Sequence, residues 1–408
     1  MNRNVPKLRF KGFDNEWKEK KLGQITKLTD GVHFTPEYVE SGVPFWSVET
    51  LASGAKPKFI TKQAHDLAIK RCHPQLNDIL ITRIGTLAKS KVITTNNELS
   101  IYVSVALIKA SKEFNSKFMK QYFDSNFYYK EFLSKSLLTA TPKKINMEDL
   151  KGTRVNIPSL QEQEKIANFL TKVDSLIEEQ DGKVQDLGLY KKGMMQKIFS
   201  QEIRFKEDNG CEYPEWEEKK LGEIISKATL GGNYENTDVI TQYPLIKMGN
   251  IDRGIINLKK IEYIPKNINI DPKDKLKIGD LLFNTRNTLD LVGKVAIWRD
   301  ELETAYYNSN LLRIEFKKCI IASNFFMNYA FNSYHILSQL KAIATGTTSV
   351  AAIYGRDLNV VKFNIPCLEE QTKIANFLSN IDLIIEQEKN KLEDLRRLKK
   401  GLLQQMFV

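Results

Sequence analysis

The sequence predicts an α+β protein with a pseudo-two-fold internal repeat, in which two small sheet-containing globules are joined by two long helices that form an antiparallel coiled coil. Three observations predict this fold: a long segment that occurs twice, short β-rich runs between turn residues, and a repeated order of globule and helix. The expected domains are a first globule, a first helix, a second globule and a second helix, at residues 1–157, 158–200, 201–365 and 366–408.

The repeated segment is residues 160–200, which recur as residues 368–408 at a constant offset of 208. Of the 41 aligned positions, 20 are identical, and six of the others exchange one aliphatic residue or methionine for another. A match of this length indicates a duplication within the chain.

Each copy of the segment predicts one long helix, because its apolar or neutral residues are spaced alternately by four and three positions, as on coiled helices. A helix of this length needs a partner for its apolar stripe, and the stripe of equal length is its own twin. The two seams are Ile166, Leu170, Val173, Ile177, Gln180, Val184, Leu187, Tyr190, Met194 and Ile198, and Ile374, Leu378, Ile381, Ile385, Glu388, Leu392, Leu395, Leu398, Leu402 and Met406.

Details of the helices favour pairing over the alternative of two unrelated amphipathic surface helices. Glycine within a helix costs about 1 kcal/mol relative to alanine, so Gly193 and Gly401, at the same step of both copies, predict a close approach of backbones. Ser159 and Glu162 fit a capping box at the start of the first helix.

The globules carry weaker matches, which extend the duplication over the whole chain. Short β-rich runs between Gly, Pro, Asn and Asp turns predict small sheets with irregular loops. The matched runs are 8–25 with 203–224, 43–51 with 243–251, 77–86 with 279–288, and 101–110 with 306–316. Helical patterns follow at 115–136 and 323–343, and then a loop of small residues at 139–145 and 344–353.

Composition narrows the classes of function. A net charge of +11 favours a polyanionic partner such as nucleic acid. We find no run of eighteen apolar residues and no signal peptide at the start of the sequence, so we expect a cytoplasmic protein without a membrane segment. The four cysteines form no C-x-x-C pair and the four histidines are dispersed, which predicts neither a disulfide framework nor a metal site. Nucleotide-binding loops are also missing, which argues against an enzyme.

The order of globules and helices, the segments IANFL and KKG in the helices, and the stretch DLLFNTRN resemble the specificity subunit of type I restriction and modification systems, commonly called HsdS. The resemblance covers essentially the whole chain and is strongest at residues 161–170 and 369–378. It implies that the globules are target recognition domains and that the chain is non-catalytic. It also implies two methyltransferase subunits and two restriction (translocase) subunits as partners, which bring S-adenosylmethionine, ATP and Mg²⁺.

Two equivalent helices laid antiparallel relate the globules by a pseudo-two-fold axis, and two-fold related readers bind half-sites about one DNA turn apart, roughly 34 Å. Because the two globules differ in sequence, we expect an asymmetric, bipartite double-stranded DNA target. The alternative is a coiled-coil scaffold that links two protein-binding domains without touching DNA. A stand-alone nuclease or methyltransferase is a third possibility, which the missing motifs disfavour.

Base discrimination needs Arg, Lys, Asn or Gln at groove edges, while other basic residues meet phosphate. Polar and basic residues at equivalent places of both globules are therefore the candidate DNA-binding residues. They are Trp46, Thr82, Arg83, Lys89, Lys91, Tyr102, Ser104, Thr139, Thr141, Lys143 and Lys144 in the first globule, and Lys247, Asn250, Asn284, Arg286, Asn308, Asn310, Thr345, Thr347, Thr348 and Ser349 in the second. On the helices, repeated polar residues off the seam are candidates for partner docking: Lys165, Asn168, Asp174, Glu178, Lys373, Asn376, Asp382 and Glu386.

Overall fold

The computed structural model describes residues 4–347 and 350–408. The chain divides into two compact units, and each unit contains one globule and a part of both long helices. Unit 1 comprises Met1–Gly182 and Lys389–Val408, and unit 2 comprises Lys183–Glu388. The four-segment division into domains made from the sequence remains a prediction.

The globule of unit 1 is built on two small sheets and a two-stranded ribbon. The first sheet has the order β2-β9-β6-β7 and is antiparallel. The second has the order β3-β5-β4-β8, in which β4 and β8 are parallel. The strands are β1 (Lys18–Lys21), β2 (Leu28–Asp30), β3 (Tyr38–Val39), β4 (Val43–Trp46), β5 (Lys58–Ile60), β6 (Ile79–Thr82), β7 (Ser90–Val92), β8 (Ser100–Ile101), β9 (Val105–Ile108) and β10 (Arg154–Ile157), with β1 paired to β10.

Helices pack against the sheets of unit 1 and close its cores, and the helix at Lys62–Arg71 packs on the second sheet. They are α1 (Leu22–Ile25), α2 (Val48–Ser53), α3 (Lys62–Arg71), α4 (Ser116–Asp124), α5 (Asn126–Ser134) and α6 (Met147–Lys151). The core joins β6 and β9 to the aromatic residues of α4 and α5, and residues 406–407 of the chain end also belong to it. The ring of Phe407 lies 6.1 Å from Trp17, 5.7 Å from Phe118 and 5.6 Å from Tyr122, centroid to centroid.

Unit 2 repeats this topology. Its first sheet has the order β12-β19-β15-β17, and its second, β14-β13-β18, again contains one parallel pair. The strands are β11 (Glu217–Lys220), β12 (Ile225–Leu230), β13 (Pro244–Ile246), β14 (Glu262–Tyr263), β15 (Leu281–Asn284), β16 (Arg286–Asn287), β17 (Val295–Ile297), β18 (Tyr306–Tyr307), β19 (Leu311–Phe316), β20 (Thr345–Gly346), β21 (Ala351–Ala352) and β22 (Lys362–Ile365). The short helices are α8 (Leu221–Ile224), η1 (Met248–Asn250), η2 (Pro272–Asp274), α9 (Asn324–Phe331), α10 (Tyr334–Ile343) and α11 (Gly355–Leu358).

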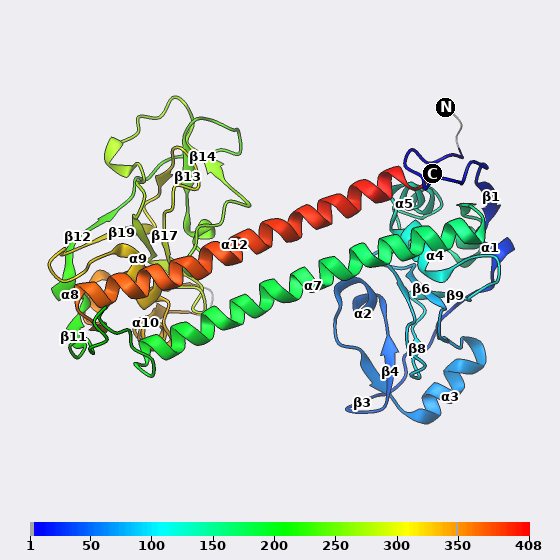
Figure 1. Ribbon diagram of the computed structural model, residues 1–408, viewed down its shortest axis with the longest axis horizontal. Coiled ribbons are helices and arrows are strands. Elements are labelled where there is room, and N and C mark those ends of the chain that lie inside the picture. The colour runs from blue at the N-terminus through cyan, green and yellow to red at the C-terminus, as the bar shows by residue number, and fades with distance from the viewer. Residues whose placement is uncertain (1–3, 348–349) are drawn as a thin grey trace. The chain divides into compact units, whose positions relative to one another are not determined.

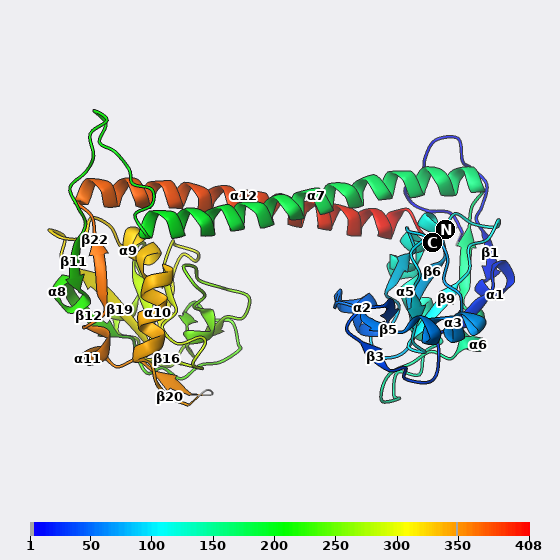
Figure 2. The same cartoon turned by 90° about the horizontal axis from the view of Figure 1, so that it is seen from below.

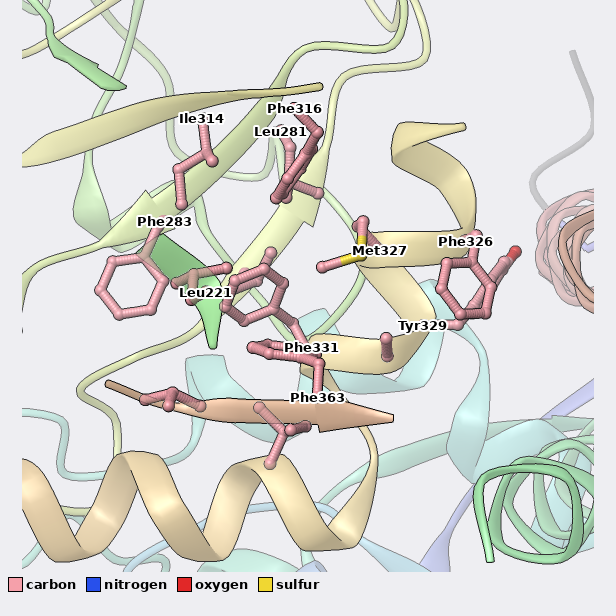
Figure 3. Close-up of a cluster of buried hydrophobic side chains, with 14 of the residues drawn as sticks. Leu221, Leu281, Phe283, Ile314, Phe316, Phe326, Met327, Tyr329, Phe331 and Phe363 are labelled. Atoms are coloured by element: carbon pink, nitrogen blue, oxygen red, sulfur yellow. The ribbon is translucent and has the colours of Figure 1, made fainter. Parts of the chain in front are cut away.

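The core of unit 2 is rich in aromatic rings. Figure 3 shows Phe331 from α9 in the middle of the cluster, with Phe283 from β15 to one side of it and Phe363 from β22 beside it. The ring centroids of Phe331 and Phe363 are 4.9 Å apart in an edge-to-face arrangement, which aromatic pairs prefer. The matched strands and helices of the two globules therefore bury equivalent faces, as the duplication predicts.

The two long helices are α7 (Leu160–Phe199) and α12 (Leu368–Gln405). Within each unit their segments lie side by side and run antiparallel (Figures 1 and 2). In unit 1, Lys399 Nζ lies 2.5 Å from Asp174 Oδ1. In unit 2, the residues at the same offset, Lys191 and Asp382, form the equivalent ion pair. Asp174 also accepts a hydrogen bond from Gln121, and Asp382 accepts one from Tyr329, so the prediction that these aspartates are outward docking residues is wrong.

The predicted seam is buried at ten of its twenty residues and half-buried at eight others. Val173 and Ile381 are 7% and 6% exposed. The seam prediction is wrong at Tyr190 and Leu398, which are 52% and 53% exposed. The spacing of apolar residues identifies a stripe along a helix, but it does not say which steps of that stripe are covered by a neighbour.

The expectation for the repeated glycines is also wrong. A Cβ atom added at Gly193 or Gly401 would meet no atom within 4 Å among the described residues. The two backbones therefore do not approach closely at this step. No helix in the described ranges, 4–347 and 350–408, is both long enough and apolar enough to span a membrane.

A buried carboxylate ties the start of each long helix to its globule. Glu162 is 1% exposed and accepts two hydrogen bonds from Arg9, at 2.7 and 2.8 Å, and one from Trp17. In unit 2, Glu370 is held in the same way by Arg204 and Trp216. The capping box predicted at Ser159 is therefore only half formed: the Ser159 hydroxyl accepts from the Glu162 amide at 3.4 Å, while the Glu162 carboxylate points to other partners.

Candidate nucleic-acid interface

Each globule carries an exposed hairpin at the end of its central sheet. Hairpin 1 is residues 137–144, which are closed by an antiparallel bridge between Leu137 and Lys144. Hairpin 2 is described at residues 345–347 and 350–352, in which β20 pairs with β21. The closing residues of the two hairpins are related by the offset of 208 that relates the long helices. The duplication therefore preserves this feature although the loop sequences differ.

Arg83 holds the base of hairpin 1. It directly follows β6, and its backbone carbonyl accepts a hydrogen bond from the amide of Ile145 at 2.9 Å. Its guanidinium donates to the carbonyls of Ile145, at 3.2 Å, and Val103, at 2.9 Å. The side chain is 7% exposed. Arg83 therefore fastens the end of the hairpin to the loop before β9, and its guanidinium is not displayed at the surface.

A buried aspartate completes this clamp. Asp30 is 6% exposed. Its Oδ1 lies 2.6 Å from Arg71 Nη2, and its Oδ2 lies 3.3 Å from Arg83 Nη1 and 2.9 Å from His33 Nε2. Burial alone raises the pKa of the Asp30 carboxyl, but the hydrogen bonds from Arg71 and His33 outweigh burial and leave this pKa below its ordinary value. Burial lowers the pKa of Arg83, and Asp30 opposes that effect. Asp30 is a residue that the sequence analysis missed.

Hairpin 2 is held by a different residue type at the equivalent place. Thr285 accepts a hydrogen bond from the amide of Ile353 at 3.0 Å, and its hydroxyl donates to the carbonyl of Asn310 at 2.9 Å. The next residue, Arg286, pairs with Ala352 of the hairpin and its side chain is exposed. Among the described residues, no hydrogen bond or ion pair engages the Arg286 guanidinium. Unit 2 thus displays an arginine where unit 1 has Ile84.

Six of the candidate DNA-binding residues are buried and hold turns inside their globules: Thr82, Arg83, Ser104, Asn250, Asn284 and Asn308. The Thr82 hydroxyl accepts from the amide of Lys89 at 2.9 Å, and the Ser104 hydroxyl accepts from that of Val48 at 3.1 Å. Asn250 donates to the carbonyls of Asn257 and Lys260. Apart from the buried Asn284 Nδ2, which has no hydrogen-bond partner among the described residues, their side chains bond mainly within the chain, so these residues position neighbours instead of facing solvent.

The other candidates lie at or near the surface. Lys89 and Lys91 are exposed, and Lys91 Nζ lies 4.9 Å from the ring centroid of the half-buried Trp46. Lys247 is half-buried and forms an ion pair with Glu262 at 2.8 Å. Thr348 and Ser349 lie outside the described residues. The remaining exposed or half-buried candidates are Tyr102, Thr139, Thr141, Lys143, Lys144, Arg286, Asn310, Thr345 and Thr347.

A groove next to Tyr102 adds residues that the sequence analysis did not select. It has a volume of about 240 Å³ and is lined by Tyr38, Lys56, Lys58 and Tyr102, among others. Lys58 Nζ lies 4.3 Å from the centroid of the Tyr38 ring. Aromatic faces with lysines suit stacking on bases and contact with phosphate. These residues lie far apart in the sequence, so no local pattern indicates this groove.

In the described ranges, no group of three or more His, Cys, Asp or Glu residues is arranged to hold a metal ion. The four cysteines are free thiols.

The fold and the hairpins define a class of protein with two similar but unequal globules, each packed on the start of one long helix and the end of the other. The chain belongs to the family of the type I restriction modification DNA specificity domain, whose model matches residues 14–186 and 213–397. The two matched segments correspond to the two copies of the duplication. The family predicted from the helices and from DLLFNTRN is confirmed.

Known relatives agree with this assignment. The specificity subunit of the type I restriction enzyme MjaVIII of Methanocaldococcus jannaschii is 26% identical over 407 residues, which cover 95% of this chain and 91% of that protein. A putative type I restriction enzyme MjaX specificity subunit of the same organism is 29% identical over 212 residues, which cover 52% of this chain and 50% of that protein.

Solved structures confirm the fold. The S subunit of a type I restriction-modification system from M. genitalium superposes with a TM-score of 0.61 at 15% identity, over 99% of both chains. A chain from a structural study of complex assembly and conformational transition of the type I system superposes with a TM-score of 0.56 at 16% identity, over 96% of this chain and 97% of that one. The α+β fold with two paired long helices is therefore confirmed.

Proposed function

We propose that this chain is the subunit that selects the DNA sequence in a type I restriction-modification complex. Each globule reads one half-site of an asymmetric, bipartite target in double-stranded DNA, and an unread spacer separates the half-sites. The observation that carries the proposal is the pair of hairpins at equivalent positions with unequal residues. Equivalent placement suits two related half-sites, and unequal residues suit different bases.

The exposed residues at and near the hairpins have two different roles, base reading and phosphate contact. Arg286 is the foremost base-reading candidate in unit 2, since arginine donates a bidentate pair of hydrogen bonds to guanine in the major groove. Lys143 of hairpin 1 and the exposed Lys89 and Lys91 supply phosphate contacts, which give salt-dependent affinity. The buried Arg83 and Asp30 act on recognition only by positioning hairpin 1.

The partners in this proposal are two methyltransferase subunits and two restriction (translocase) subunits. The chain itself is non-catalytic, and S-adenosylmethionine, ATP and Mg²⁺ bind to the partners. The assembly works in the cytoplasm, where its DNA substrate lies. The basic net charge of +11 favours DNA over the alternative of a scaffold that contacts proteins alone.

The test is to express the full chain with the methyltransferase subunit of its system and to sequence the methylated positions in the host DNA. We expect one split, asymmetric motif, and the purified complex should retain a duplex that carries this motif more strongly than one with a changed half-site at moderate salt. Methylation without any motif, or equal retention of both duplexes, would refute the proposal and favour the scaffold.

A further inference from the structure

The groove of about 240 Å³ in unit 1 lies on one face of the second sheet. Tyr38 of β3 pairs with Ile60 of β5, and Lys58 of β5 pairs with Phe45 of β4. Paired residues and alternate residues of a strand share a face, so these four side chains point to the same side. Ile60 and Phe45 are buried in one cluster with Ala68 of α3. Tyr38 and Lys58 are exposed, so the groove is the part of this face that α3 leaves open.

Aromatic rings and lysines line the groove together. The ring of Phe45, which is 2% exposed, lies 6.2 Å from that of Tyr38 and 6.0 Å from that of Tyr102, centroid to centroid. Lys56 and Lys58 border the same space, and within the described ranges neither of them forms an ion pair with a carboxylate. Flat aromatic surface favours a stacked planar ring, and free ammonium groups beside it favour phosphate.

The volume of the groove limits what it can hold. About 240 Å³ is the share of roughly eight water molecules in the liquid, and a nucleobase has a similar number of non-hydrogen atoms. One unstacked base therefore fits the groove, whereas a base pair does not. Glu49 and Ser104 also line the groove. A carboxylate accepts hydrogen bonds from the amino group of a base, and the Ser104 hydroxyl, which accepts from the Val48 amide, can still donate.

The groove adjoins the base of hairpin 1. The carbonyl of Ser104 accepts a hydrogen bond at 2.9 Å from the amide of Arg83, the residue that fastens the hairpin. Val48, which also lines the groove, lies next to Gly85: a Cβ atom added at Gly85 would be 3.8 Å from Val48 Cγ2. The amide of Gly85 donates to the carbonyl of Lys143 at 2.8 Å. DNA that contacts hairpin 1 is therefore adjacent to the groove.

Unit 2 has different residues at the equivalent positions. The register of the second sheet aligns Lys58 with Glu262, and the isolated bridges align Tyr102 with Asn308. Glu262 is paired with Lys247 at 2.8 Å, and Asn308 is buried. The duplication repeats the sheet but not the aromatic and basic lining, so the groove suits a feature of one half-site only.

We propose that this groove holds one nucleobase that is extruded from the duplex at or beside the half-site of unit 1. The proposal rests on the proposed function, because it requires unit 1 to bind double-stranded DNA. The base stacks against Tyr38 and Tyr102, and Glu49 accepts a hydrogen bond from its amino group. Lys56 and Lys58 contact the flanking phosphates. Extrusion breaks one base pair and its stacking, and the contacts in the groove offset that cost.

The test measures how tightly the full chain, assembled with its methyltransferase subunit, binds duplexes that carry one mismatch each. At every position in and beside the first half-site, the base on one strand is kept and its partner is changed, for both strands in turn. We expect one mismatch to tighten binding about tenfold, because the extruded base then leaves no intact pair. Mismatches at the other positions of the half-site should weaken binding.

Variants connect this gain to the groove. Tyr38→Leu and Tyr102→Leu should each abolish the gain and weaken binding of the matched duplex about tenfold, since a stacking ring is lost. Tyr38→Phe keeps the ring and should keep the gain. Tyr190→Leu, a change of an exposed tyrosine on α7, is the matched control and should bind as the wild type does. Unchanged thermal unfolding will show that the variants fold.

A second reference is the base that the methyltransferase extrudes for its own reaction. A mismatch at that base should tighten binding in the wild type and in Tyr38→Leu alike, because its pocket belongs to the methyltransferase.

Three results would count against the proposal. Sequence-specific binding without a mismatch gain that depends on Tyr38 overturns the proposal and leaves the proposed function intact. Tyr38→Leu and Lys58→Ala variants that weaken all duplexes equally would make the groove a backbone contact, which also overturns it. A wild-type complex that binds the cognate duplex no better than one with a changed half-site removes both the proposal and the proposed function.

Discussion

Phe407 provides the sharpest test of how unit 1 is assembled. Its side chain is 4% exposed and contacts the rings of Trp17, Phe118 and Tyr122 at centroid distances of 5.6 to 6.1 Å. Replacing a buried phenylalanine by alanine costs about 3–5 kcal/mol, and each aromatic pair adds about 0.5–1.5 kcal/mol beyond burial. Because the measured cost of such a replacement already includes ring contacts, and Phe407 has three of them, we expect Phe407→Ala to lower the free energy of unfolding of unit 1 by about 4–5 kcal/mol, the upper part of that range.

Hydrogen exchange measured by mass spectrometry can assign this loss to one unit, because exchange reports the free energy of opening segment by segment. Peptides that cover α4 and α5 should lose protection in Phe407→Ala, while peptides that cover α9 should keep it. The matched variant is Phe199→Ala, whose half-buried ring contacts Trp216 and Phe326 in unit 2. It should reverse the pattern with a smaller loss. A loss below about 1 kcal/mol, or one shared equally by both units, would refute this account of the core.

Four further predictions follow from the structure. Because the pKa of Asp30 is lowered in the folded state, its carboxylate stabilises unit 1 above the ordinary aspartate pKa of about 4, and this stability is lost as pH falls through the folded pKa. In urea unfolding, Asp30→Asn should be about 1–3 kcal/mol less stable than the wild type at pH 7. The difference between the two should be smaller near pH 3. Gly193→Ala and Gly401→Ala should each stabilise the chain by about 0.5–1 kcal/mol, since the added methyl group meets open space in a helix. Arg286→Ala should weaken binding of the cognate duplex by about 1–3 kcal/mol in a competition assay. A chain of residues 1–208 should form a dimer in sedimentation, as the helical duplication predicts.

A specific experimental result would contradict each of these four predictions. A difference between Asp30→Asn and wild type that does not change with pH would remove the carboxylate from the acid response. A loss of stability in either glycine variant would mean that the open space is needed. Arg356→Ala is the control for Arg286, since this exposed arginine contacts its own neighbour Asp357; equal effects of the two variants would leave Arg286 without a specific role. A strictly monomeric fragment would contradict the pairing of the helices.

Sequence periodicity predicted the long helices well because burial of one face repeats every three to four residues. Val173 and Ile381 are buried as expected. Tyr190 and Leu398 are not, because a stripe does not specify how far along it a neighbour reaches. The same limit applies to Gly193, whose repetition suggested a contact that the structure does not contain.

The candidate interface was predicted less completely, because residue type cannot tell an arginine that reads DNA from one that holds the backbone. Arg83 and Arg286 stand in similar stretches, RIG and RNT, yet one is 7% exposed beside Asp30 and the other faces solvent. The deciding partner, Asp30, is 53 residues away in the sequence. Only the sheet that places β2 near the end of β6 brings the two together.

The composition of the two units has a consequence for synthesis on the ribosome. Unit 2 is a single continuous stretch, whereas unit 1 needs residues 389–408 in addition to its first 182. The core of unit 1 therefore stays incomplete, with Trp17, Phe118 and Tyr122 lacking their contacts to Phe407, until unit 2 has been synthesised. Exposed apolar surface in such an intermediate promotes aggregation or chaperone binding. Slower translation of residues 389–408 therefore lengthens the time for which this surface of the nascent chain is exposed.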